Sequence, residues 1–292
     1  MYDIRRYYPA RSVSEALALL AAHPDAKLIA GGSDILLRIR EGRLSGCTLV
    51  GIGGIQEITG ISRDEQGDIR IGAATTFSRI TADPVINSYI PVLGRAVDQV
   101  GGPQIRNVGT IGGNLCNGAV SADSASTLFS LEAKLALTGQ TGERIVPIED
   151  FYLGPGKVDI RPGELLTRIL ISRENYDGYF GHYIKYAMRN AMDIATLGCS
   201  VAAKTDSNIL TDVRITFGVA APVPLRCRET EEKLRGMEIG ETLYHLAEEG
   251  VRAEIKPRDS WRASKAFRLQ IGGEIARRAL KQAIMLAGGG YG

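Results

Sequence analysis

The chain has 292 residues, of which 44% are hydrophobic and 23% are charged. This length is sufficient for two domains with separate cores, and the composition is not that of a disordered protein. Because 35 basic side chains stand against 33 acidic ones, for a net charge of +2, the charge does not indicate a nucleic-acid or polyanion surface.

The N-terminal segment MYDIRRYYPARS has no apolar h-region and no Ala-x-Ala cleavage site. No window of the sequence approaches the roughly eighteen apolar residues needed to span a bilayer. We therefore expect a cytoplasmic protein without a membrane span. Cys47, Cys116, Cys199 and Cys227 are isolated, so their spacing indicates neither a zinc site, an iron–sulfur cluster nor a disulfide framework, and buried free thiols are expected.

The first elements are a helix and a short strand. Ser12 and Glu15 form a capping box ahead of apolar residues at helical spacing, which predicts a helix over Val13–Ala22. His23-Pro24 ends that helix. Lys27–Ala30 is predicted to be a short buried strand, and it stops at the glycine turn Gly31–Asp34.

Strand patterns dominate the next part of the chain. TLVGI, ITGIS and IRIGAA, between residues 48 and 74, are predicted strands. TTFSRI and the helical stretch NSYIPVLGRAVDQVGG follow. After them comes GTIGGNLCNGAVSADSAS, residues 109–126, which consists almost entirely of small side chains, and then three further strands, AKLALTG, ERIVPI and ELLTRILIS.

A polar, aperiodic segment, RENYDGYFGH, predicts a domain boundary. Beyond it, TLGCSVAAKT and LTDVRITFGVAA have the pattern of long antiparallel strands, and GETLYHLAEEGV and SKAFRLQIGGEIARRALKQAIMLA that of helices. We expect two α+β domains, over residues 1–176 and 177–292.

Two glycine-containing turns, Gly31–Asp34 and Thr110–Asn114, could clasp one pyrophosphate, because such turns direct backbone N–H groups at anionic oxygens. Each could equally be an ordinary tight turn. Neither matches a P-loop, and GIGGIQ has Gln56 where a dinucleotide fingerprint needs its third glycine. A Rossmann domain is further disfavoured because strands and helices do not alternate regularly.

Together the motifs resemble a known family. KLIAGGSDILLRIREG, GDIRIGAATTFSRI, VGGPQIRNVGTIGGNLCNGAVSADSASTL, GPGKV, YIKYAMRNAMDIATLGC, FGVAAPVPLRC and PRDSWRASKAFRL, in this order, resemble the FAD-binding medium subunit of the molybdenum hydroxylases, most closely that of bacterial xanthine dehydrogenase. The resemblance covers essentially the whole chain. It implies a vanillyl-alcohol-oxidase (PCMH) type FAD-binding domain of two subdomains, followed by an α+β domain of the CO dehydrogenase flavoprotein C-terminal type.

The resemblance also implies a non-covalent FAD site. By matching positions, the cofactor-binding residues would be Lys27, Leu28, Ile29, Ala30, Gly31, Gly32, Ser33 and Asp34 for the adenine and pyrophosphate, Gly109, Thr110, Ile111, Gly112, Gly113 and Asn114 for the pyrophosphate and ribityl chain, Asp123 for the ribityl or flavin edge, and Leu165 and Lys185 to complete the pocket. Val100 stands where relatives can place an aromatic ring against the flavin. FAD would thus supply the bulk that residues 109–126 omit.

The implied function is electron transfer. FAD would collect electrons from the [2Fe–2S] clusters of a small partner subunit, which receives them from a molybdopterin centre in a large partner subunit, and would pass them to NAD⁺. No catalytic residue and no metal ligand is expected in this chain. Relatives that reduce aromatic acyl-CoA thioesters carry a cysteine-bearing insertion, which is absent here. The alternatives are a self-contained flavoenzyme of the same fold and a nucleotide-binding module without a redox role.

Several single residues have a second interpretation. Asp123 could cap a helix that begins at Ser124, a role compatible with contact to the flavin region, and Lys185 could be an exposed charge on an edge strand. Arg106 and Asn107 are expected to brace the second glycine turn, and Trp261 to anchor the last helix by packing. The three histidines, His23, His182 and His245, lie in unlike contexts, so we expect no histidyl–flavin bond.

Overall fold

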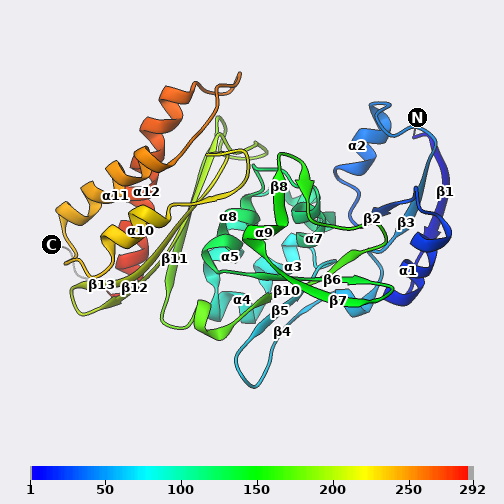
Figure 1. The fold of residues 1–292 in the computed structure, drawn as a ribbon, viewed down its shortest axis with the longest axis horizontal. Helices are drawn as coiled ribbons and strands as arrows, with labels where there is room; N and C mark the ends of the chain where they lie inside the picture. Colours follow the sequence, from blue (N-terminus) through cyan, green and yellow to red (C-terminus); the bar gives the residue numbers. More distant parts are fainter. Residues whose placement is uncertain (1, 289–292) are drawn as a thin grey trace.

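The computed structural model describes residues 2–288. Within them the chain forms three bodies, arranged in a row in chain order (Figure 1). These are an N-terminal lobe built on a three-stranded sheet, a central body built on a five-stranded sheet, and a C-terminal domain built on a four-stranded sheet.

The N-terminal lobe is a small parallel sheet with strand order β1-β3-β2. Its strands are β1 (Ile4–Pro9), β2 (Lys27–Ile29) and β3 (Cys47–Gly51), and its helices are α1 (Val13–Ala22) and α2 (Ile35–Arg40). Helix α1 has the predicted bounds, and Ser12 Oγ accepts the Glu15 N–H at 3.0 Å. The Glu15 carboxylate also reaches back past the N-cap and accepts the Arg11 N–H at 2.7 Å.

Strands β2 and β3 end at the same edge of this sheet. Ile29 lies opposite Gly51, and the Ile52 N–H donates to the Ile29 carbonyl at 2.8 Å. The loops that follow the two strands therefore leave side by side, and a Cβ added at Gly53 would lie 3.3 Å from the Ala30 carbonyl oxygen. This edge faces the central body.

The central body is an antiparallel sheet with strand order β4-β5-β10-β6-β7. Its strands are β4 (Ile61–Arg63), β5 (Ile69–Gly72), β6 (Lys134–Gly139), β7 (Gly142–Pro147) and β10 (Leu165–Ile171), with a small hairpin of β8 (Tyr152–Gly154) and β9 (Lys157–Val158). Its helices are α3 (Phe77–Ala82), α4 (Pro84–Tyr89), α5 (Pro91–Val97), α6 (Pro103–Val108), α7 (Ile111–Cys116), α8 (Asp123–Ser130) and α9 (Ile148–Phe151). Short 3-10 turns cover Gln56–Ile58 and Arg173–Asn175.

Two sequence predictions for the central body need correction. The helix predicted around Ile90 is divided into α4 and α5, because Pro91 can begin a helix but cannot continue one. The segment ITGIS is a strand only from Ile61, since a 3-10 turn occupies Gln56–Ile58. The predicted strands at β5, β6, β7 and β10 are confirmed within one or two residues.

The C-terminal domain is an antiparallel sheet with strand order β11-β12-β13-β14, covered on one face by helices (Figure 1). The strands are β11 (Phe180–Tyr186), β12 (Leu197–Asp206), β13 (Ile209–Gly218) and β14 (Leu225–Arg226), and the helices are α10 (Arg228–Leu234), α11 (Glu241–Glu254) and α12 (Lys265–Leu286). Trp261 does not anchor α12 as predicted. Its side chain is 77% exposed, and the Arg262 guanidinium stacks 4.4 Å from the centre of its ring.

Helix α8 joins the central body to the C-terminal domain. All eight of its residues are buried, and most of them are small. Its carbonyl groups accept hydrogen bonds from the C-terminal sheet: Thr216 Oγ1 donates to the Ser126 carbonyl at 2.6 Å, and Arg214 Nη1 to the Ser130 carbonyl at 3.1 Å. Small side chains allow this close approach, so the first residue of α8, Asp123, is held at the interface.

No helix of the described residues is long and apolar enough to cross a membrane. Over the same residues, no group of three or more His, Cys, Asp or Glu side chains is placed to hold a metal ion. Cys199 and Cys227 are buried free thiols, whereas Cys47 and Cys116 are only partly buried.

Candidate functional site

The first glycine turn offers hydrogen-bond donors that the protein does not use. The backbone N–H groups of Gly31, Gly32, Ser33 and Asp34 find no protein acceptor in the part of the chain that the structure describes. Gly32 has a φ of +78°, a conformation that favours glycine. Consecutive free N–H groups in a turn of this kind can bind an anionic oxygen.

The second glycine segment is a helix start rather than the open turn that the sequence predicted. Thr110 caps α7, since its Oγ1 accepts the Gly113 N–H at 3.1 Å. The Ile111 N–H donates to the Thr75 carbonyl and the Gly112 N–H to the Ala73 carbonyl, at 3.0 and 2.8 Å. These N–H groups are already satisfied by protein acceptors and are not available to a ligand, whereas the N–H groups of the first turn are.

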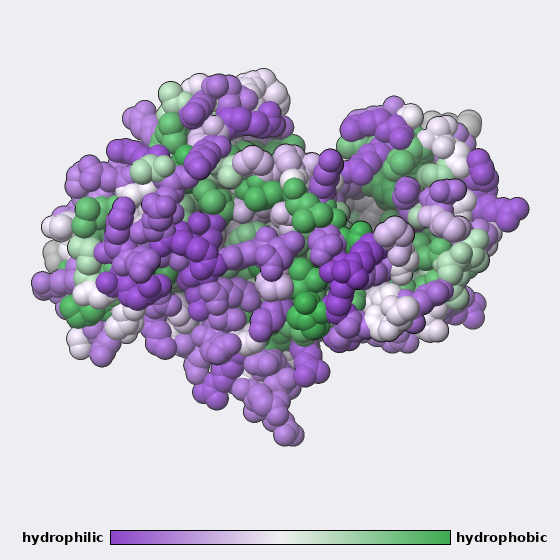
Figure 2. Space-filling view, viewed as in Figure 1, coloured by the Kyte–Doolittle hydropathy of each residue, from purple (hydrophilic) through white to green (hydrophobic). Residues whose placement is uncertain are grey.

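Each glycine segment packs against other backbone with no room for a side chain. A Cβ added at Gly31 would lie 1.8 Å from the carbonyl oxygen of Val108, just before the second segment, and one added at Gly112 would lie 2.6 Å from the Cβ of Ala73, just after β5. Both distances are below those that carbon atoms tolerate. Figure 2 shows the surface hollowed between the lobe that carries α2 and the rest of the molecule.

A buried ion pair lies where α8 meets β11. Lys185 Nζ lies 2.8 Å from Asp123 Oδ2 and also donates to the Gln99 carbonyl at 2.9 Å. The Tyr183 hydroxyl donates to Asp123 Oδ1 at 2.7 Å. An ammonium group has three N–H donors, so Lys185 retains one for a ligand.

This geometry rejects both simpler interpretations. Asp123 does not cap α8, because its side chain turns to Lys185 and Tyr183 and the cap position belongs to Ala122. Lys185 does lie on the edge strand β11, but its side chain is only 8% exposed. Burial raises the pKa of the Asp123 carboxyl, and attraction to Lys185 opposes that rise. Burial likewise raises the pKa of the Tyr183 hydroxyl.

The other predicted cofactor-binding residues differ in how far they are buried. Lys27 is exposed at the start of β2, Leu28 and Ile29 are half-buried, and Val100 packs partly buried against the central core. Leu165 is fully buried in the core of the N-terminal lobe, so it can support a pocket wall only from behind. Asn114 Oδ1 accepts the Ser124 hydroxyl at 2.7 Å, which ties α7 to α8.

Arg106 and Asn107 were predicted to brace the second glycine turn, and their contacts tie α6 to its neighbours instead. Arg106 Nη1 donates to the Val100 carbonyl at 3.2 Å, and its Nε lies 3.2 Å from Asp98 Oδ1. Asn107 Oδ1 accepts the Ser78 hydroxyl at 2.6 Å. These contacts fix the segment that leads into Gly109 and α7.

Comparison with known proteins identifies the family. Residues 2–173 match the family described as the FAD binding domain in molybdopterin dehydrogenase, and residues 182–283 match the CO dehydrogenase flavoprotein C-terminal domain. The chain belongs to the FAD-binding medium subunits of the molybdenum hydroxylases. The expected family and fold class are therefore confirmed.

Individual members of this family are similar over their full lengths. The chain is 39% identical to the xanthine dehydrogenase FAD-binding subunit of Escherichia coli O157:H7 over 289 residues, 99% of each chain. It is 30% identical to the carbon monoxide dehydrogenase medium chain of Hydrogenophaga pseudoflava, over 95% of this chain and 96% of that one. A solved structure of carbon monoxide dehydrogenase from the same organism superposes with a TM-score of 0.92 at 28% identity, covering 98% and 99% of the two chains.

Sequence reasoning about this medium subunit missed four groups of the site. Tyr183 and the Gln99 carbonyl complete the Asp123–Lys185 cluster, and Arg38 and Asn117 link α2 to α7. The period-two alternation of β11 could have indicated Tyr183, because it places Tyr183 and Lys185 on one face. Nothing local marks the other three, since their partners are distant in sequence.

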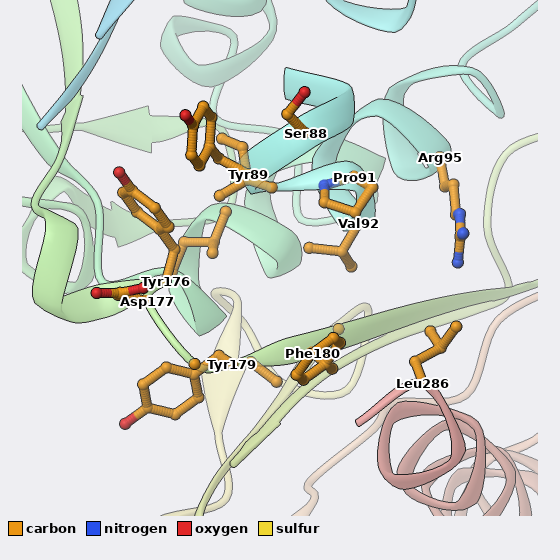
Figure 3. A pocket seen from close by; sticks show the side chains of 15 residues that line it. Ser88, Tyr89, Pro91, Val92, Arg95, Tyr176, Asp177, Tyr179, Phe180 and Leu286 are labelled. Atoms are coloured by element: carbon orange, nitrogen blue, oxygen red, sulfur yellow. The ribbon is translucent and has the colours of Figure 1, made fainter. Parts of the chain in front are cut away.

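An apolar cavity of about 370 Å³ lies elsewhere in the medium subunit, between α4, α5 and the start of β11. Figure 3 shows Tyr89 on one side of it and Phe180 and Leu286 on the other. None of the predicted cofactor-binding residues lines it. It is therefore separate from the glycine segments and from the ion pair.

Proposed function

We propose that this chain is the FAD-binding electron-transfer subunit of a cytoplasmic molybdenum hydroxylase of the xanthine dehydrogenase type. The observation that carries the proposal is the row of free N–H groups at Gly31–Asp34, held in close backbone contact with Val108, just before the Gly109–Asn114 segment. A pyrophosphate needs several such donors and close approach to the backbone. The residues therefore fit FAD.

Each wall of the site would hold one part of the cofactor. The turn and strand at Lys27–Asp34 would bind the adenine and pyrophosphate, and Gly109–Asn114 would close on the pyrophosphate and ribityl chain. Ser33 and Thr110 lie at these positions, although the Thr110 hydroxyl already caps α7. Val100 would contact the flavin by aliphatic packing, and Leu165 would support the wall from the lobe core.

The polar edge of the flavin would meet the ion pair. Lys185 would donate its remaining N–H to a flavin or ribityl oxygen, while Asp123 and the Gln99 carbonyl fix the position of the ammonium. Because Tyr183 donates to the other carboxylate oxygen, Asp123 is restrained from both sides. The C-terminal domain thus contributes to the site through β11, and we place its boundary with the FAD-binding domain between residues 176 and 177.

Bound FAD would supply the redox chemistry, accepting electrons from [2Fe–2S] clusters and delivering a pair to NAD⁺. The relatives are named as medium chains and FAD-binding subunits of dehydrogenases. By extension, we propose a small [2Fe–2S] subunit and a large molybdopterin subunit as partners. Substrate would be oxidised on the large partner and would not contact this chain.

The division of labour can be tested on the purified full-length chain loaded with FAD. We expect it to oxidise NADH with an artificial dye as acceptor and not to oxidise xanthine, hypoxanthine or another heteroaromatic substrate. Addition of the two partner subunits should restore substrate oxidation with NAD⁺ as acceptor. Substrate turnover by the chain alone, at confirmed purity, would instead support a self-contained flavoenzyme, and a complex active only with other acceptors would contradict the NAD⁺ assignment.

A further inference from the structure

A hydrogen-bonded bridge of three side chains joins the N-terminal lobe to α7. Arg38 Nη2, on α2, donates to Asn117 Oδ1 at 2.7 Å. Asn117 Nδ2 donates in turn to Asp34 Oδ1 at 3.0 Å. Asp34 immediately precedes α2 and Asn117 immediately follows α7. Asn117 is 79 residues from Arg38 and 83 residues from Asp34, so the bridge joins distant parts of the chain.

The chemistry of the bridge fixes the orientation of its central amide. A guanidinium group only donates hydrogen bonds and an ionised carboxylate only accepts them. Asn117 must therefore turn its oxygen to Arg38 and its NH₂ to Asp34. An aspartate at position 117 could accept from Arg38 but would face Asp34 with a like charge, and an alanine would make neither bond.

The bridge ends on the two segments proposed to hold the cofactor. Asp34 is the last residue of the turn with the free N–H groups. The Asn117 N–H donates to the Gly113 carbonyl at 3.0 Å, so Asn117 is fixed to the glycine-containing turn of α7. The contact of Gly31 with Val108 lies between the same two bodies. The Gly31–Val108 contact involves backbone atoms, whereas the bridge is made by side chains that solvent can reach.

Exposed hydrogen bonds of this kind are individually weak and can break while the protein stays folded. We propose that Arg38, Asn117 and Asp34 form a latch that holds the N-terminal lobe closed against α7 and so slows the release of bound FAD. This inference rests on the proposed function. Arg38 and Asn117 would be positioning residues, because they act through the placement of the turn at Gly31–Asp34.

The test compares FAD dissociation rates, measured by the rise of free-flavin fluorescence on dilution of the FAD-loaded full-length chain, together with any subunits that copurify with it. Arg38→Ala and Asn117→Ala should each accelerate release about fivefold, the order expected for the net contribution of one solvent-exposed hydrogen bond. The release rate of the double variant should exceed that of the faster single variant by no more than about twofold, because both changes open the same latch.

Two further variants separate the latch from a general effect on the fold. Arg40 lies on the same helix, and its side chain makes no hydrogen bond or ion pair in the described structure. Arg40→Ala should therefore release FAD at the wild-type rate. Asn117→Asp should release FAD at least as fast as Asn117→Ala, because of repulsion from Asp34. The melting temperature of the FAD-free chain should be the same in every variant.

Unchanged release rates in Arg38→Ala and Asn117→Ala, with FAD bound normally by the wild type, would overturn the latch and leave the proposed function intact. Equal acceleration in Arg40→Ala, or full additivity in the double variant, would also overturn it. A wild-type chain that takes up no FAD, alone or with copurifying subunits, would overturn the proposed function and the latch together.

Discussion

Lys185 and Asp123 form an ion pair that crosses from the C-terminal domain to the FAD-binding domain, with Nζ and Oδ2 2.8 Å apart and side chains only 8% and 6% exposed. Charges buried to this degree lose their hydration, and the loss is offset only when both are paired and hydrogen-bonded. Here the Gln99 carbonyl and the Tyr183 hydroxyl complete the pairing. The pair therefore joins the two domains at the proposed flavin site.

Lys185→Met should lower the free energy of unfolding of the FAD-free chain by about 3 kcal/mol at pH 7, because it leaves the Asp123 carboxylate buried without its cation. Urea denaturation measures this change. Lys134→Met, at an exposed lysine on β6, is the matched control and should stay within about 0.5 kcal/mol of the wild type. Equal effects of the two substitutions would show that the ion pair contributes no specific stability.

The deficit of Lys185→Met should depend on pH. Burial already raises the pKa of Asp123, and loss of the Lys185 cation, which opposes that rise, would raise it further. Below this raised pKa the folded state holds a neutral carboxyl, which is less costly to bury. The deficit relative to the wild type should therefore be largest at neutral pH and shrink toward pH 4. A deficit of the same size at pH 4 and pH 8 would contradict the assignment to Asp123.

Three glycines of the candidate site should not tolerate a larger side chain. Gly31→Ala should abolish FAD retention, because its Cβ would overlap the Val108 carbonyl. Gly32→Val should do the same through strain at a φ of +78°, about 1–2 kcal/mol or more, and by filling the turn. Gly113→Val should also lose FAD, since the new side chain crowds Thr110 Oγ1, 2.9 Å from the added Cβ.

Gly54→Ala is the matched control for these glycines. It follows the neighbouring strand β3, and an added Cβ has no atom within 4 Å. Flavin absorbance per chain, together with circular dichroism to confirm the fold, measures the outcome. Normal flavin content in Gly31→Ala and Gly32→Val would reduce the first glycine segment to an ordinary turn.

Glu231 should make the stability of the C-terminal domain sensitive to pH. Its carboxylate is buried beside Arg226 Nε, 2.8 Å away, and burial raises its pKa from the usual 4.5 to about 7. Because the pKa of Glu231 is higher in the folded state than in the unfolded chain, protonation of Glu231 favours the folded state. This contribution is complete below pH 4.5 and is lost as the pH rises through 7.

The wild type should therefore lose stability relative to Glu231→Gln between pH 5 and pH 8, by up to about 3 kcal/mol. The informative quantity is the slope of the difference with pH, because the substitution also alters the contact with Arg226. A difference that does not vary with pH would mean that Glu231 remains ionised throughout this range.

Local signals in the sequence were sufficient for many elements. The capping box at Ser12 and Glu15 gave the bounds of α1, and alternating apolar residues gave β5, β6 and β10. Strand β1 has no such signal, because almost all of IRRYYP is exposed. It forms because it pairs in parallel with β3, about forty residues later in the chain, a contact that no local pattern reports.

The candidate site was less accessible to sequence reasoning for the same physical reason. Gly112 and Gly113 weaken helix propensity, but the Thr110 cap and the packing of Gly112 on Ala73 outweigh it, so α7 forms where a turn was predicted. Asp123 precedes a helical pattern and resembled a cap, yet its partner Lys185 lies 62 residues away. The family resemblance brought these two residues to attention, and the structure supplied their contact.

Non-covalent binding of FAD by this chain is tested most directly by the flavin content of the purified full-length protein after reconstitution. Heat or acid should release a yellow compound that behaves as FAD on chromatography, at about one equivalent per chain, leaving colourless protein. A chain that takes up no FAD, or whose flavin stays attached to the denatured polypeptide, would contradict the account.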